Sequence, residues 1–239
     1  MPDALLGIDT VFFDLDGTLL DESGLPAAVR GACEVIAAGA ELAVDDLLAS
    51  NTRVWADLWP EVYEEWMIGA VDVGALGTEA WRQTLAGCGV RDEDAVRLAV
   101  TTHEQLERRA HRVYPDAVAV LDALRERGVR IGLVTNGAAA VQRAKLRAVE
   151  LESYFDPLII SSEVGVMKPQ PGIFEHALVQ AGTTPDRAAM VGDHLWHDVE
   201  AAQSAGLRGV WIDRRGVEPK AEWPRPNVVV PGLAHLLAR

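Results

Sequence analysis

Thr10-Val11-Phe12-Phe13-Asp14-Leu15-Asp16-Gly17-Thr18 is the stretch of this 239-residue sequence that decides the fold. Its first four residues are apolar or β-branched, which is typical of a strand buried on both faces by helices. Asp14 and Asp16 follow where this strand runs out into a loop, and the two-residue period directs both side chains toward the same side. An open parallel sheet binds its ligands outside the carboxyl ends of its strands. The stretch therefore predicts both a sheet and a polar site at its edge.

Other apolar runs along the chain also lead into polar residues. The runs are residues 130–134, 188–191 and 158–160, and the polar residues that follow them are Thr135, Asn136, Gly137, Asp193, Asp198 and, after a loop, Lys168. Because the carboxyl ends of parallel strands meet at one edge of a sheet, we expect all of these residues to gather in one site with Asp14 and Asp16.

Helical and strand patterns alternate strictly after Tyr114-Pro115, as in a doubly wound sheet. Helices are predicted near residues 116–127, 138–149, 172–181 and 198–205, and strands near 157–161, Met190 and Val210. A last strand and helix are predicted over residues 227–230 and 233–238. The pattern predicts an α/β fold with a Rossmann-like, doubly wound parallel sheet.

Residues 19–114 show helical periodicity and hardly any strand signal. Pro26 opens one predicted helix, and Thr78 and Asp92 are predicted to cap two others. We therefore predict an α-helical domain over residues 19–114, inserted into an α/β core of residues 1–18 and 115–239. Aromatic residues are frequent in the predicted bundle, and we expect them to pack in its core. They are Trp55, Trp59, Tyr63, Trp66 and Trp81.

Composition limits the partners that this chain can have. Its formal net charge of −14 argues against nucleic acid, because neutralising a phosphate backbone needs a basic patch. No stretch approaches the roughly 18 apolar residues that span a bilayer, and the first residues lack the basic region of a signal peptide. We expect a cytoplasmic monomer or homodimer with no membrane partner. Cys33 and Cys88 lack metal-ligand spacing and are expected to be packing thiols.

The carboxylates and the lysine predict a site that handles phosphate. Asp14 and Asp16 are costly neighbours unless a cation or a shared proton separates their roles, so that one can attack while the other moves a proton. Asp193 and Asp198 add oxygen ligands, and such a set suits Mg²⁺ beside a substrate phosphate. We expect Lys168 to screen the charge of that phosphate.

A phosphate cradle is predicted where the 130–134 run ends. Thr135 offers a hydroxyl donor. Asn136 and Gly137 lie at the start of a predicted helix, whose free backbone N–H groups and dipole favour an anion. The expected partner is therefore a small phosphorylated metabolite.

These residues resemble, in order and in strand context, the four motifs of the haloacid dehalogenase-like hydrolase superfamily. The match spans Val11 to Asp198, and the first motif, Asp-x-Asp-Gly-Thr, begins at Asp14. The helical insertion directly after it resembles the C1-type cap of phosphoglycolate-phosphatase-like and related subfamilies. The resemblance implies that residues 19–114 are a cap domain and that the protein is a Mg²⁺-dependent phosphatase.

The resemblance also implies a role for each residue of the site. Asp14 would be the nucleophile that forms an aspartyl-phosphate, and Asp16 would protonate the leaving oxygen and then activate water. Asp193 would ligate Mg²⁺ beside Asp14 and the Asp16 carbonyl. Lys168 would neutralise the nucleophile and the phosphate, and Asp198 would either lie in the outer shell of the metal or orient Lys168. The residues implied for phosphate binding are Thr135, Asn136, Gly137 and Lys168.

Other functions stay open at this stage. The same superfamily contains phosphomutases, which hold a bisphosphate intermediate, and dehalogenases, which attack carbon and need neither a metal nor an acid at the position of Asp16. A non-catalytic binding protein could also retain the fold. His194 and His197 depart from the small polar residues usual in the last motif. His194 could reach the substrate or the outer shell of the metal, and His197 would be a surface residue at the helix start, although we expect both to be structural.

Overall fold

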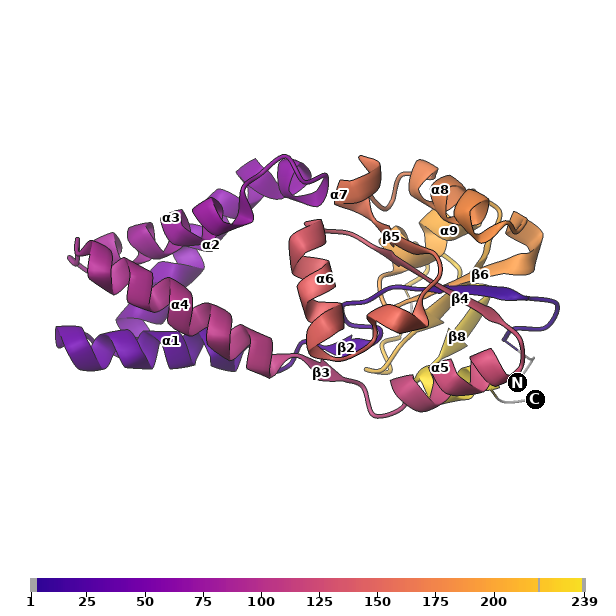
Figure 1. Cartoon of the computed structure of the whole chain (residues 1–239), viewed down its shortest axis with the longest axis horizontal. Coiled ribbons are helices and arrows are strands. Elements are labelled where there is room, and N and C mark those ends of the chain that lie inside the picture. Colours follow the sequence, from indigo (N-terminus) through magenta and orange to yellow (C-terminus); the bar gives the residue numbers. More distant parts are fainter. Residues whose placement is uncertain (1–3, 219, 238–239) are drawn as a thin grey trace. The chain divides into compact units, whose positions relative to one another are not determined.

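The computed structural model describes residues 4–218 and 220–237. The chain divides into two compact units, one formed by Met1–Asp21 with Val113–Arg239 and the other by Glu22–Arg112 (Figure 1). The first unit is built around a sheet, and the second is helical. No helix among the described residues is both long and apolar enough to cross a membrane.

A six-stranded sheet with the order β5-β4-β1-β6-β7-β8 forms the centre of the first unit. All neighbouring strands in it are parallel. Its strands are β1 Thr10–Phe13, β4 Arg130–Thr135, β5 Leu158–Ile160, β6 Ala188–Gly192, β7 Arg208–Ile212 and β8 Val228–Val230. Phe13, the last residue of β1, lies in register with Leu133 and Val191, so β4 and β6 end within two residues of the end of β1. The predicted doubly wound parallel sheet is confirmed.

Helices cover both faces of this sheet. They are α5 Ala117–Glu126, α6 Ala139–Ala148, α7 Ser161–Val164, α8 Gly172–Ala181 and α9 Ala201–Ser204, with the 3₁₀ turns η1 Glu152–Tyr154, η2 Pro185–Arg187 and η4 Leu233–Leu237. Phe13 packs in a core cluster with Leu121 of α5, whereas Phe12 packs in a separate cluster with Phe174 of α8. Successive residues of β1 thus face opposite layers, which explains why the strand is continuously apolar.

Several predicted boundaries are corrected by the structure. The helix expected from Asp198 begins earlier, as the π-helical turn η3 Leu195–Glu200, because His194 Nδ1 accepts a hydrogen bond from the backbone N–H of His197 at 3.1 Å. The C-terminal helix expected over residues 233–238 is the 3₁₀ turn η4, and Ala238 lies outside the described residues.

The structure also places the edges of the inserted segment differently from the sequence prediction. Leu19 and Leu20 are buried in the core of the first unit, and the Tyr114 N–H donates to the Leu19 carbonyl at 2.9 Å. These residues therefore belong with the sheet unit. A two-stranded sheet of β2 Leu20–Asp21 and β3 Arg112–Val113, which the sequence did not predict, lies at these positions.

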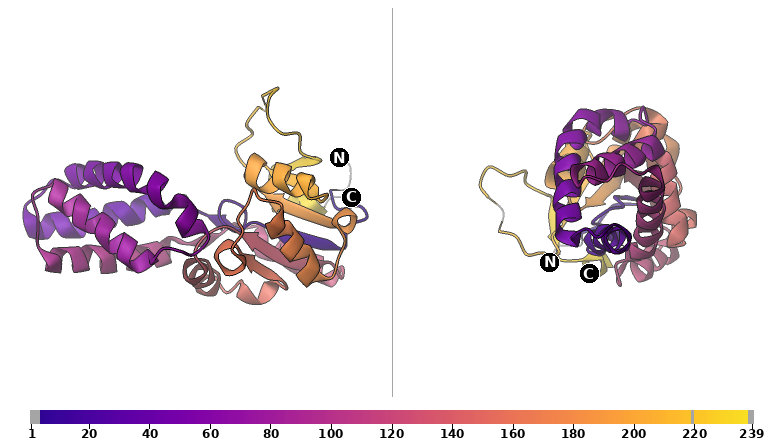
Figure 2. Two further views of the ribbon diagram at one scale, coloured as in Figure 1. Left: turned by 90° about the horizontal axis from the view of Figure 1, so that it is seen from above. Right: turned by 90° about the vertical axis from the view of Figure 1, so that its left-hand side faces the viewer.

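The second unit consists of four helices, with α1 packed against α4 and α2 against α3 (Figures 1 and 2). They are α1 Leu25–Ala40, α2 Val44–Met67, α3 Val73–Gly87 and α4 Glu93–Ala110. Pro26 lies in the first turn of α1, and Asp92 caps α4 by accepting from the Asp94 N–H at 3.0 Å. Thr78 is not a cap, since α3 begins earlier and Asp72 accepts from its first turn.

The core of the helical unit is small. It contains Cys33, Ile36, Leu47, Trp81, Leu85, Val96 and Ala99 among its buried residues. Cys33 and Cys88 are free thiols, and burial raises the pKa of Cys33 to about 11.

Most of the aromatic residues expected in that core lie outside it. Trp55, Trp59, Tyr63 and Trp66 are only half-buried along α2 and contact one another edge to face, with ring centroids 5.5–6.4 Å apart. Trp81 alone among the five joins the buried cluster. Helical spacing gathers the α2 rings on one face but does not bury them.

Candidate active site

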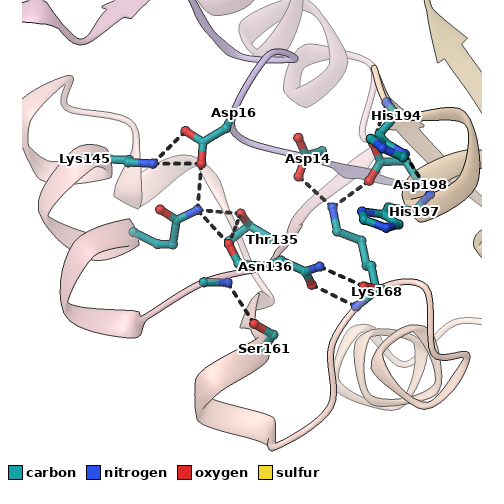
Figure 3. A network of polar contacts seen from close by, with 12 residues as sticks. Asp14, Asp16, Thr135, Asn136, Lys145, Ser161, Lys168, His194, His197 and Asp198 are labelled. Atoms are coloured by element: carbon teal, nitrogen blue, oxygen red, sulfur yellow. Dashed lines mark hydrogen bonds and ion pairs between the residues drawn. The ribbon is translucent and has the colours of Figure 1, made fainter. Parts of the chain in front are cut away.

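The polar residues predicted from the strand ends lie together at the carboxyl edge of the sheet (Figure 3). Asp14 follows β1, Thr135 ends β4 and Asp193 follows β6. Lys168 enters from the loop between α7 and α8. The edge is therefore where chain segments distant in sequence meet, as the sheet topology requires.

Lys168 joins two carboxylates in the interior. Its Nζ lies 2.6 Å from Asp14 Oδ1 and 2.6 Å from Asp198 Oδ1, and the residue is only 2% exposed. Burial opposes the positive charge, but the two carboxylates outweigh it and raise the pKa of Lys168 above its usual value. The lysine is therefore cationic, and charge-assisted hydrogen bonds fix it against Asp14.

Negative charge exceeds positive charge around Asp14. Burial raises the pKa of Asp14 well above its usual value, Lys168 opposes that shift, and Asp198 and Asp193 add to it. Burial and Asp198 likewise raise the pKa of Asp193. Three carboxylates thus share one ammonium group, so the site favours a further cation.

The arrangement of oxygen atoms agrees with that charge balance. Asp14, Asp193 and Asp198 each offer a carboxylate oxygen, and these atoms lie within 4.8 Å of one another. Both oxygens of Asp198 are engaged, one by Lys168 and the other by the His194 N–H at 3.0 Å. Asp14 and Asp193 are consequently the carboxylates better placed to hold a hard divalent cation, and a set of oxygen donors fits such an ion.

Gly17 lets the first loop approach Asp193. Its φ of +77° lies in the left-handed region, and a Cβ added there would lie 2.5 Å from Asp193 Oδ2. A larger side chain would force the Asp193 carboxylate to move and would strain the backbone, which explains the glycine in the Asp-x-Asp-Gly sequence.

The cradle around Thr135 differs from the prediction in two respects. The Asn136 side chain forms reciprocal hydrogen bonds of 2.8 Å with the backbone of Lys168, donating to its carbonyl and accepting from its N–H. Gly137 donates its N–H to Ser161 Oγ at 2.9 Å, and α6 begins later, at Ala139. The Asn136 side chain therefore positions the Lys168 loop, and phosphate binding by Asn136 and Gly137 stays a prediction.

Two residues that the sequence analysis did not identify complete the site. Lys145 and Gln142, both on α6, hydrogen-bond to the carboxylate of Asp16 (Figure 3). The available signal was their position: both fall on the inward face of a short helix with the apolar Leu146. A polar residue on a buried face requires a partner, and here the partner is Asp16.

The two histidines of the last motif are engaged with each other. Their rings stack with centroids 4.1 Å apart, and His194 caps η3 as described above. Burial, followed by the charge of His194, lowers the pKa of His197. Asp198 accepts hydrogen bonds from Lys168 and from the His194 N–H, and it therefore connects the lysine to the start of η3.

A cavity of about 160 Å³ lies beside Asp193 within the sheet unit. Its wall includes Trp196, Trp211 and Trp223, and the indole N–H of Trp211 donates to the Asp193 carbonyl at 2.9 Å. One side of the site is therefore aromatic.

The family follows from comparison with known proteins. The chain belongs to the haloacid dehalogenase-like hydrolases, because the model of that family matches residues 8–206. It is 39% identical over 160 residues to phosphoserine phosphatase from Thermus thermophilus, a match that spans 67% of this chain and 63% of that enzyme. It is also 34% identical to N-acylneuraminate-9-phosphatase from Mus musculus, over 97% of this chain and 93% of the relative.

Solved structures agree on the architecture. The 2-haloacid dehalogenase from Pseudomonas syringae superposes with a TM-score of 0.69 at 26% identity, covering 96% of each chain. The predicted superfamily membership is confirmed by both kinds of comparison.

Proposed function

We propose that this protein is a Mg²⁺-dependent phosphatase that hydrolyses a small phosphorylated metabolite through an aspartyl-phosphate on Asp14. The observation that carries the proposal is the buried contact between Lys168 and Asp14, with a second carboxylate, Asp16, at the end of the same strand. Relatives that are named as phosphatases support the same reaction class.

Asp14 is the proposed nucleophile. A carboxylate oxygen of Asp14 attacks phosphorus while the ester bond between phosphorus and the leaving oxygen breaks, and Asp16 gives that oxygen a proton. In the second half, Asp16 takes a proton from water, which attacks the phosphorus of the aspartyl-phosphate. Inorganic phosphate leaves, and Asp14 is restored.

Lys168 and Thr135 are proposed to stabilise the transferring group. Lys168 is fixed against the nucleophile, where its charge reduces the repulsion between a carboxylate and a phosphate dianion. Thr135, almost fully buried at the end of β4, can donate its hydroxyl to a phosphoryl oxygen. Lys168 is already held against Asp14, so its charge is in place before the phosphoryl group arrives.

Asp14 and Asp193 would hold the metal ion. When bound, Mg²⁺ supplies positive charge against the phosphoryl oxygens and relieves the excess of carboxylates around Lys168. Asp198 contributes by holding Lys168 in place.

Asp16 argues against dehalogenation, although several structural neighbours are dehalogenases. Attack on carbon with loss of halide needs no proton donor, whereas this chain holds a second carboxylate in the site with dedicated partners on α6. An alkoxide that leaves from phosphorus does need a proton donor.

The test measures inorganic phosphate release from phosphorylated metabolites and p-nitrophenyl phosphate, with and without Mg²⁺. We expect metal-dependent release that Asp14→Asn abolishes and that Asp186→Asn, an exposed aspartate of the same unit, leaves intact. Normal turnover by folded Asp14→Asn would end the covalent mechanism. Transfer of phosphate between positions of a sugar, without release, would indicate a phosphomutase.

A further inference from the structure

Asp16 has a cation of its own, separate from the one that binds Asp14. Lys145 Nζ lies 3.0 Å from Asp16 Oδ1 and 2.8 Å from Oδ2, so it contacts both carboxylate oxygens. Figure 3 shows the Asp16 side chain turned toward Lys145, while Asp14 faces Lys168. Adjacent carboxylates that would otherwise repel each other are thus held by different ammonium groups.

Gln142 connects Asp16 with the phosphate side of the site. Its Nε2 lies 3.0 Å from Asp16 Oδ2, 2.8 Å from Thr135 Oγ1 and 3.1 Å from the Asn136 carbonyl. A single amide therefore contacts the proposed acid, the proposed phosphate ligand and the backbone of Asn136, whose side chain holds the Lys168 loop.

Burying these two residues is costly. Gln142 is 0% exposed and Lys145 is 9% exposed, and the i,i+3 spacing places both on one face of the ten-residue helix α6. Gln142 Oε1 is buried without a hydrogen-bond partner among the described residues. An unsatisfied buried acceptor costs free energy that an apolar residue would avoid. The amide is therefore oriented by what its nitrogen contacts.

We propose that Lys145 and Gln142 are positioning residues that hold the Asp16 carboxyl group, and through Gln142 the Thr135 hydroxyl, in register for proton transfer to the leaving oxygen. Both residues contact Oδ2 of Asp16, so in its acid form Asp16 would carry the proton on Oδ1 in place of the 3.0 Å contact with Lys145. This inference rests on the phosphatase proposed above. Neither residue is proposed to contact the substrate; each acts through Asp16 or Thr135.

The test compares leaving groups that differ in their need for a proton. Loss of Lys145 in Lys145→Met should slow formation of the phosphoenzyme from an alkyl phosphate about 10- to 100-fold. It should slow formation from p-nitrophenyl phosphate much less, because p-nitrophenolate leaves without an acid. Rapid-quench kinetics measures this step apart from later hydrolysis.

Controls separate positioning from general damage. Arg147→Met removes an exposed positive charge from the same helix and should leave both rates unchanged. Lys145→Arg retains a cation that can bind both carboxylate oxygens and should recover part of the alkyl-phosphate rate. In an Asp16→Asn background, Lys145→Met should add little further loss, because the residue acts through Asp16.

Three results would overturn the inference. An equal loss of the phosphoenzyme formation rate for both substrates would mean that Lys145 only stabilises the fold. A rise in KM of the same size for both leaving groups would make Lys145 a phosphate ligand. Additive losses in the double variant would show that Lys145 does not act through Asp16.

If the wild type formed no phosphoenzyme at all, the proposed phosphatase function itself would be refuted. The contact between Lys145 and Asp16 would then be tested by urea unfolding of Lys145→Met, Asp16→Asn and the double variant. Additive changes in the free energy of unfolding, with no coupling between the two residues, would refute the contact.

Discussion

Lys168 lies 2.6 Å from both Asp14 and Asp198, so one buried ammonium group fixes the proposed nucleophile and joins the end of β1 to the turn η3. Removing one member of such a buried set leaves the other charges without compensation. We expect Lys168→Met to abolish phosphate release and to destabilise the sheet unit by about 3–5 kcal/mol, the usual result of breaking a buried ion pair. Urea unfolding followed by circular dichroism measures the loss. Unchanged stability would show that the contact is not maintained in solution.

Binding of Mg²⁺ should stabilise the sheet unit through Asp193. A ligand that binds only the folded state at about 100 times its Kd adds about 2.7 kcal/mol, which appears as a higher thermal midpoint. We expect Mg²⁺ to raise the midpoint of the wild type and of Asp186→Asn, and to have little effect on Asp193→Asn. An equal shift in all three proteins would place the metal elsewhere.

Gly17→Ala should damage the site more than its backbone conformation alone explains. Both Gly17 and Gly128 have a positive φ, of +77° and +74°, but a Cβ at Gly17 would meet Asp193, whereas a Cβ at Gly128 would meet nothing within 4 Å. Each substitution should cost about 1–3 kcal/mol of stability for the strained backbone. Only Gly17→Ala should also weaken activation by Mg²⁺, as measured by the metal dependence of phosphate release. Loss of activation in both variants would refute the role of this close approach.

His194→Ala tests whether that histidine is structural. It caps η3 by accepting the His197 N–H, and loss of a cap costs about 0.5–2 kcal/mol. We expect a lower free energy of unfolding with kcat within a few-fold of the wild type. A large drop in kcat at unchanged stability would instead assign His194 to the substrate or the metal.

His103 should make the helical unit sensitive to acid. Burial lowers its pKa below 6.5, although Glu107 and Glu104 oppose the shift, and its Nδ1 accepts from the Trp81 indole N–H at 3.3 Å. Below about pH 6.5 the unfolded chain then binds a proton more readily than the folded unit, so stability is complete above that pH and falls as the pH is lowered. Hydrogen-exchange protection of α3 and α4 should decrease between about pH 7.5 and pH 5.5, and His103→Gln should flatten the change. Equal pH dependence in both proteins would contradict this assignment.

The sequence predicts the sheet and much of the site because both depend on local patterns. The apolar run before Asp14 requires burial on two faces, and strand ends of a parallel sheet must meet, so Asp14, Thr135 and Asp193 gather whatever the loops do. The sequence also predicts Lys168 as part of the site, because its motif occupies the expected place in the order of the four family motifs.

The remaining features depend on contacts that periodicity does not specify. The inward positions of Gln142 and Lys145 are visible in the sequence, but their contact with Asp16 depends on where α6 lies relative to the loop that follows β1. Asn136 has an amide that suits either a phosphate or a backbone, and only the path of the Lys168 loop selects the backbone. Likewise, Asp72 and Thr78 are both acceptable caps, and the helix start decides between them.

The most direct measurement traps the covalent intermediate. The enzyme is mixed with ³²P-labelled substrate and Mg²⁺, quenched in acid within one turnover, reduced with borohydride and digested for peptide mapping. We expect the label before reduction, and homoserine after it, to occur at Asp14 and to be absent from Asp14→Asn. Full turnover with no labelled protein, or label on another residue, would contradict nucleophilic catalysis by Asp14.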